Sequence, residues 1–170
     1  MACKQTPSQT VGPFFSIGFD TLNRVDLSAG AGNAERIAIR GRVLDGNGCA
    51  VPDAVLEIWQ ADPQGNFPQP DCSVAADSPS HSDFFGFGRV PTNEQGEFVF
   101  TTVKPGALKE SGSHLPAPHL AISVFMRGLL QRLVTRLYFP DEPRNESDPV
   151  LALVPAERRS TLIARRTGDG

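Results

Sequence analysis

Short runs of alternating apolar and polar residues, separated by glycine and proline, constrain the fold of this chain more than any other feature. Residues 97–103 read EFVFTTV and residues 133–139 read LVTRLYF. The same pattern occurs over residues 37–45, 54–61, 86–92 and 119–127. A period of two is typical of β-strands with one buried face. Six such strands with turn-rich connections predict an all-β fold, an antiparallel β-sandwich.

The connections between these runs add detail. The sequence DGNG (Asp45–Gly48) is typical of a tight turn, and it predicts a β-hairpin that joins the first two strands. Residues 62–85 and 104–118 are rich in proline, serine and glycine and have no period, so they predict two long loops. The first is long enough to be more often functional than accidental.

The length of 170 residues fits one domain with a real core. We expect residues 1–36 to form an N-terminal arm and loop, and residues 37–170 to form the sandwich. Pro155 can begin a helix, and Leu162 and Ile163 are spaced to pack inward ahead of two arginines. This pattern predicts a short C-terminal helix.

Composition excludes several function classes. The formal charge is −3, and no run of lysine or arginine suggests nucleic-acid binding. No apolar stretch is long enough to span a membrane, and no signal peptide is recognisable, so a cytoplasmic protein is expected. Cys3, Cys49 and Cys72 are far apart and odd in number, which favours reduced thiols without a structural role.

Residue spacing alone identifies no catalytic set. Of the three histidines, His81, His114 and His119, only His119 enters a predicted strand, and the residue two positions on is Ala121. A lone histidine there is expected to be structural, because a metal site normally needs several ligands. No nucleophile elbow or phosphate-binding glycine loop is present. Tyr138 and Trp59 are expected to pack in the core.

Two segments stay open on spacing alone. Residues 6–15 read TPSQTVGPFF, a stiff stretch with two prolines and no period, and termini of this kind are often frayed. Arg127 stands next to Gly128 at the end of a predicted strand. It is either a solvated strand-end arginine or a guanidinium that binds an anion.

The motifs TPSQTVGPFF, DGNG, LEIWQAD, FGFGR, TVKPG, APHLAIS, TRLYF and RRSTLIA follow one another over nearly the whole chain. In this order they resemble the α chains of protocatechuate-cleaving intradiol dioxygenases. The resemblance implies an enzyme of two homologous chains, α and β, in which the β subunit holds Fe(III) with two tyrosines and two histidines. That site cleaves protocatechuate with O₂ to 3-carboxymuconate.

The resemblance also implies that this chain lacks the ligand set. The first ligand tyrosine would stand near Phe67, and the second at Ala107 or Leu108. The histidine pair would fall on His119 and Ala121, so one of four ligands remains. A phenylalanine ring has no lone pair for a metal. We therefore expect no iron in this chain, no catalytic residue, and no activity without the β subunit.

By the same resemblance, the arm lies against the iron pocket of the β chain. Thr10, Gly12 and Pro13 would line that pocket, Phe14 would continue its wall, and Arg127 would face the substrate carboxylate. Proline restricts φ and glycine lets backbone approach a flat ligand closely, so a stiff, non-helical arm is expected.

Two other functions stay open: a stand-alone β-sandwich that binds ligands or proteins without catalysis, and an independent iron dioxygenase. One departure from the family bears on stability. Family α chains continue beyond LIARR into a further strand, whereas this sequence ends at TGDG. Either the chain is truncated or a partner covers the sheet edge that the strand would have paired.

Overall fold

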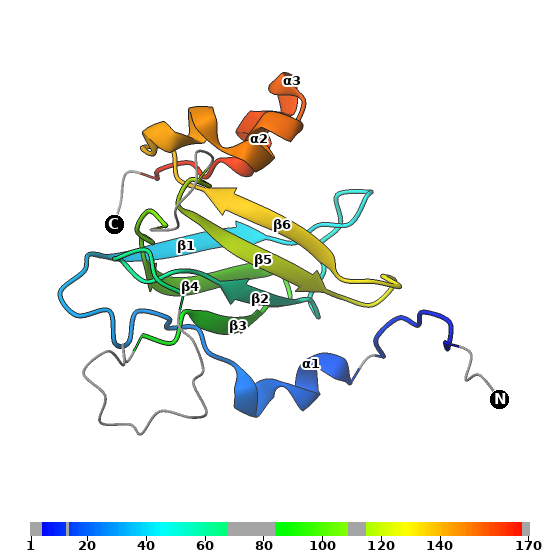
Figure 1. The fold of residues 1–170 in the computed structure, drawn as a ribbon. Helices are drawn as coiled ribbons and strands as arrows, with labels where there is room; N and C mark the ends of the chain where they lie inside the picture. Colours follow the sequence, from blue (N-terminus) through cyan, green and yellow to red (C-terminus); the bar gives the residue numbers. More distant parts are fainter. Residues whose placement is uncertain (1–4, 13, 68–83, 109–114, 168–170) are drawn as a thin grey trace.

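The computed structural model describes residues 5–12, 14–67, 84–108 and 115–167. Its strands are β1 (Arg36–Arg42), β2 (Val55–Trp59), β3 (Phe87–Pro91), β4 (Glu97–Val103), β5 (His119–Phe125) and β6 (Leu133–Tyr138). They form one four-stranded sheet of order β3-β2-β5-β6 and one two-stranded sheet of order β1-β4, all antiparallel (Figure 1). The predicted antiparallel β-sandwich is confirmed.

The core lies between the two sheets and follows the alternation read from the sequence. Leu56 and Ile58 of β2, Leu120 of β5 and Phe100 of β4 are each at most 2% exposed and belong to one apolar cluster. Because successive side chains of a strand point to opposite faces, each strand contributes every second residue to this cluster.

The predicted hairpin between the first two strands is wrong, although its turn is right. Gly48 has φ of 82°, and its N–H donates to the Asp45 carbonyl at 3.0 Å. The chain then turns again after Pro52 and enters the other sheet, so that β1 pairs with β4 and β2 pairs with β3 and β5. Proline has no N–H for a strand ladder, which ends the pairing at this point.

Residues 20–28 are more than the surface loop expected there. After α1 (Phe15–Gly18) and η1 (Asp20–Leu22), the chain bonds to both sheets. The Arg24 N–H donates to the Arg89 carbonyl of β3, and the Leu27 N–H donates to the Thr101 carbonyl of β4, both at 2.8 Å. Leu27 is 3% exposed. This segment therefore closes the seam between the sheets.

The C-terminal residues cover the end of the sheet where β5 begins and β6 ends (Figure 1). The elements are η2 (Pro143–Ser147), α2 (Pro149–Leu153), α3 (Ala156–Arg159) and η3 (Ser160–Leu162). Helix α3 starts directly after Pro155, which confirms the predicted short helix, and Leu162 and Ile163 pack against buried Tyr138 and Leu151. Across the described residues, no helix is both long and apolar enough to cross a bilayer.

Candidate functional site

A small cavity lies where the loop after β2 meets the loop after β4. Its volume is about 10 Å³, which is room for about one water molecule. The lining residues are Ala61, Phe67, Pro105, Gly106, Leu108, Ala117, Pro118 and His119. Phe67, Leu108 and His119 occupy three positions where the family resemblance implies iron ligands. The fold thus brings these three residues, distant in sequence, around one space.

Two glycines allow the loops around this cavity to pack backbone against backbone. Gly65 has φ of 82°, and a Cβ on it would overlap the carbonyl oxygen of Ala107. The Gly106 N–H donates to the Asp62 carbonyl at 2.9 Å, while the Asp62 carboxylate accepts two N–H groups of its own turn at 2.8 Å. The cavity walls are therefore fixed by main-chain contacts.

His119 is tied to the protein rather than directed at a set of ligands. Its Nδ1 lies 2.7 Å from the Ala117 carbonyl oxygen, which can only accept, so Nδ1 carries the proton. Burial lowers the pKa of His119 below its usual value, so the ring is neutral at pH 7 with a lone pair on Nε2. Ala121, two residues on and on the same face of β5, offers only a methyl group.

Tyr138, the only tyrosine, is a core residue as predicted. It is 0% exposed, and its hydroxyl donates to Oδ1 of Asp148 at 3.0 Å. Arg136 donates to the same hydroxyl at 3.3 Å. Burial raises the pKa of Tyr138. Its oxygen is therefore a neutral, tethered group and is not among the cavity-lining residues.

Asp148 was not singled out from the sequence. It is 0% exposed, and its carboxylate accepts the N–H groups of Ala117 and Leu151 at 2.8 Å as well as the Tyr138 hydroxyl. Burial alone would raise the pKa of Asp148, but the hydrogen bonds from Leu151, Ala117, Tyr138 and Val150 together outweigh it, and the pKa is lowered. The sequence could have indicated Asp148 as the N-cap of a helix, because an aspartate followed by proline, here Pro149, is a typical helix start.

Two of the other predicted residues, Thr10 and Arg127, lie at the opposite end of β5. The Gly128 N–H, in the turn after β5, donates to the Thr10 hydroxyl at 2.8 Å. Residues 5–12 of the arm form no helix or strand. The arm thus contacts the β5–β6 turn in this chain, which the sequence did not predict.

The remaining arm residues differ in their surroundings. Phe14 is 76% exposed, and a Cβ on Gly12 would meet no atom within 4 Å. Pro13 lies outside the described residues. Residues 5–12 are non-helical as expected, and α1 begins at Phe15, whose ring lies 6.0 Å from that of Phe125. Phe15 therefore packs this end of the arm against the end of β5.

Arg127 lies in the turn beyond the end of β5, and its guanidinium already has an anionic partner. Its Nε donates to Oδ2 of Asp53, which precedes β2. The Arg127 side chain is 55% exposed. β5 runs from His119 to Phe125, which separates its two ends by about 20 Å, and Arg127 lies two residues beyond the far end. His119 and Arg127 therefore lie at opposite ends of β5 in this chain.

The expectation that Trp59 lies in the core is wrong. Trp59 is 45% exposed, because Leu56 and Ile58 occupy the inward positions of β2 and leave Glu57 and Trp59 on the outer face. Its ring packs against Phe87 of β3 with centroids 4.7 Å apart. The alternation of side chains along LEIWQ predicts this outward position of Trp59.

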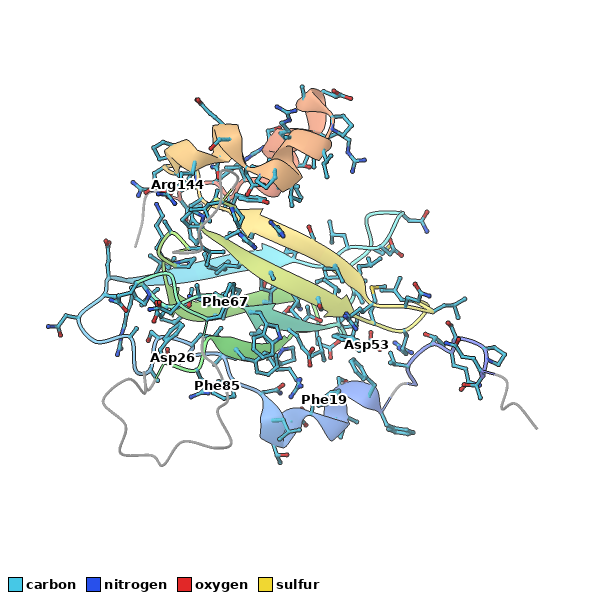
Figure 2. All side chains as sticks on the ribbon, in the orientation of Figure 1. Phe19, Asp26, Asp53, Phe67, Phe85 and Arg144 are labelled. Carbon is cyan, nitrogen blue, oxygen red and sulfur yellow. The ribbon has the colours of Figure 1, made fainter. Side chains whose placement is uncertain are left out.

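Arginines and further aromatic rings cover the rest of this outer face. Arg89 pairs with Glu57 at 2.6 Å and lies over the Phe19 ring at 4.4 Å, while Arg24 lies over the Phe85 ring at 4.9 Å. Figure 2 shows Phe19 and Phe85 below the sheet, beside α1 and β3. The face is thus a partly exposed surface of stacked rings and paired charges.

A larger open depression of about 840 Å³ lies elsewhere, between β1, β4 and the end of β3. Arg40, Arg42, Glu97, Phe98 and Val90 are among its lining residues. None of the predicted site residues lines it.

Comparisons with known proteins identify the family of the chain. Residues 12–168 match the family described as Dioxygenase. The chain is 43% identical to the protocatechuate 3,4-dioxygenase alpha chain of Burkholderia cepacia, over 96% of this chain and 84% of that protein. It is 40% identical to the alpha chain of Pseudomonas putida, over 95% and 84%. Its identity to the Burkholderia cepacia beta chain is 37%, over 79% and 57%.

Among solved structures, the dioxygenase domain of a dioxygenase carbohydrate-binding protein fusion from Streptomyces sp. SirexAA-E shares the fold. The TM-score is 0.63, with 24% identity, over 98% of this chain and 91% of that one. The fold and sequence together define an intradiol dioxygenase, and this chain belongs to that Fe(III)-using family. Within the family it is a homologue of the protocatechuate 3,4-dioxygenase alpha chain.

Proposed function

We propose that this chain is the α-type, non-iron-binding subunit of a cytoplasmic protocatechuate 3,4-dioxygenase. In this proposal it completes an active site whose Fe(III) belongs to a homologous β chain. Residues 1–36 serve as the arm and residues 37–170 as the scaffold. The exposed free thiol of Cys49 suits a reducing compartment.

The cavity around His119 carries the proposal. Iron(III) needs several donors, preferably hard anionic oxygens, and the lining supplies one side-chain donor, the His119 imidazole. The described residues contain no cluster of three or more His, Cys, Asp or Glu able to hold a metal ion. A volume of about 10 Å³ also leaves no room for a catechol beside an ion. The residues present do not fit the metal.

The exposed end of β5 supports the second half of the proposal. Thr10, Gly12, Pro13, Phe14 and Arg127 are the residues we assign to the partner's pocket. Arg127 lies beyond the end of β5 and His119 lies at its start, so in this proposal Arg127 acts at the partner's site and not with His119. There it would donate charge-assisted hydrogen bonds to the carboxylate of protocatechuate, while the arm excludes water and orients the ring.

Purification of the chain alone and after co-expression with the β chain of its source organism tests this function. We expect the chain alone to hold far less than one iron per molecule and to open no ring. The αβ complex should bind iron and convert protocatechuate with O₂ uptake. His119→Gln should leave the iron content and turnover of the complex unchanged. Stoichiometric iron with activity in the chain alone would contradict the proposal, and failure to bind β would favour a stand-alone binding module.

Arg127→Ala in the αβ complex tests the residue assignment. A charge-assisted hydrogen bond contributes about 1.5–3 kcal/mol, so KM for protocatechuate should rise about tenfold or more. KM for catechol, which has no carboxylate, should not change. Equal effects on both substrates would indicate a structural role for Arg127 instead.

A further inference from the structure

The contact between Arg127 and Asp53 uses one edge of the guanidinium only. Nε donates to Oδ2 of Asp53, whereas Nη1 and Nη2 donate to no described residue. A guanidinium is planar, and its Nη1/Nη2 edge can bind a carboxylate through two parallel hydrogen bonds. The Asp53 contact therefore leaves the Nη1/Nη2 edge of Arg127 available for a ligand.

Asp53 itself is held firmly by the residues on either side. The Ala54 N–H donates to the Thr92 hydroxyl at 3.0 Å, and that hydroxyl donates to the Val51 carbonyl at 2.8 Å. Ala54 is 0% exposed, while the Asp53 side chain is 20% exposed. Figure 2 shows Asp53 at the end of the sheet near the tip of β5. The carboxylate thus stands on a fixed backbone at the surface.

The turn that carries Arg127 is held from its other side as well. Gly128 has φ of 89°, which fixes the turn geometry, and its N–H donates to Thr10 of the arm at 2.8 Å. Three segments, namely the arm, the turn before β2 and the β5–β6 turn, thus meet around Arg127. The backbone of these segments is thus held in place. Only the Arg127 side chain depends on a further contact, the one with Asp53, for its orientation.

We propose that Asp53 is a positioning residue that aims the Nη1/Nη2 edge of Arg127 at an anionic group of the substrate. This inference rests on the proposed function, in which Arg127 faces the substrate carboxylate. An arginine held in one orientation loses less side-chain freedom on binding than a mobile one. Asp53 also repels an anion, but an anion on the far edge lies roughly twice as far from Asp53 as from the guanidinium, so attraction prevails.

Asp53→Asn in the αβ complex tests the inference, because asparagine keeps the shape and removes the charge. We expect KM for protocatechuate to rise about fivefold, a loss of about 1 kcal/mol. KM for catechol and kcat for both substrates should stay unchanged. Asp53→Glu should recover part of the affinity. Asp141→Asn, which breaks exposed ion pairs with Lys104 and Arg166 at the other end of the sheet, is the matched control and should have no effect.

The double variant separates this inference from the proposed function. If Asp53 acts through Arg127, Asp53→Asn should add nothing in an Arg127→Ala background. If Arg127→Ala leaves KM unchanged, the role of Arg127 in the proposed function is wrong. If Arg127→Ala raises KM but Asp53→Asn lowers it or leaves it alone, the inference is wrong. Failure of both Asp53 variants to assemble with β would show a structural role and overturn it as well.

Discussion

The two ends of β5 have opposite characters. At its start, His119 is partly buried beside a cavity of about 10 Å³ with mostly apolar walls. Beyond its end, Arg127 is 55% exposed and lies among Asp53, Thr10 and the arm. The first end is packed like a protein core, whereas the second presents polar groups to whatever binds there. One strand thus carries both a filled site and an open one.

This contrast fits the proposed function, in which the scaffold of the family serves an active site in another chain. A change of residues at one end of a strand leaves the other end untouched, because side chains about 20 Å apart contribute independently to stability and binding. The filled end can then be optimised for packing. The following predictions test how rigid the filled end at His119 is, and whether the open end at Arg127 is independent of it.

The largest effect is expected for Asp148→Ala at the filled end. The substitution leaves the buried Tyr138 hydroxyl and the N–H groups of Ala117 and Leu151 without their acceptor. Each unsatisfied buried group costs about 1–3 kcal/mol, so the free energy of unfolding should fall by about 3 kcal/mol or more. Urea denaturation measures it. A loss below 1 kcal/mol would show that Asp148 does not tie the helices to the sheet.

Gly65→Ala should cause the next largest loss of stability. A Cβ there overlaps the Ala107 carbonyl and needs an unfavourable positive φ, so we expect a loss of about 2–3 kcal/mol. Gly12→Ala is the matched control, because its Cβ meets no atom within 4 Å. It should leave the stability of the chain unchanged. In the αβ complex, however, Gly12→Ala should lower activity if the arm lines the partner's pocket.

A smaller effect is expected for Thr10→Val at the open end. Valine keeps the shape but cannot accept the Gly128 N–H, so a hydrogen bond of about 0.5–1.5 kcal/mol is lost. Amide exchange at Gly128 should therefore become several-fold faster, while core amides keep their rates. Thr161→Val, which removes a threonine hydrogen bond to Arg158 at the C-terminal end, should not alter exchange at Gly128. Unchanged exchange in Thr10→Val would mean that the arm does not rest on this turn.

The smallest effect concerns the titration of His119. Burial lowers the pKa of His119 in the folded chain, so the unfolded chain binds more protons below the ordinary value of 6.5. Stability should rise with pH through the range between the folded and the ordinary pKa, and fall as the solution is acidified. His119→Gln should flatten this part of the curve. Parallel curves for both proteins would show that the imidazole is solvated.

The sequence predicted the strands well, because their signal is local. Alternation over 97–103 and 133–139 placed β4 and β6 within a residue of their observed bounds. The same alternation, applied to β2, would also have put Trp59 on the surface, because Leu56 and Ile58 both face inward and Trp59 follows Ile58. The error came from treating a large aromatic residue as buried by type alone.

Pairing between strands was harder to predict, because a turn fixes only its own residues. The turn at Asp45–Gly48 formed as expected, yet the strands on either side joined different sheets. The burial of Leu27 and Asp148 has the same origin. Each of the two residues contacts groups from distant parts of the chain, and no local sequence pattern predicts which groups those are.

What the sequence determined by itself is the list of strands and the family, and the family resemblance implied that three metal-ligand positions carry side chains without donors. Such facts depend on residue type and on spacing over a few positions. Only the tertiary structure decided that Phe67, Leu108 and His119 surround a nearly filled cavity, that Arg127 lies at the other end of β5, and that Asp53 pairs with Arg127. Those facts depend on which distant segments meet, and that is set by the burial of apolar surface over the whole chain.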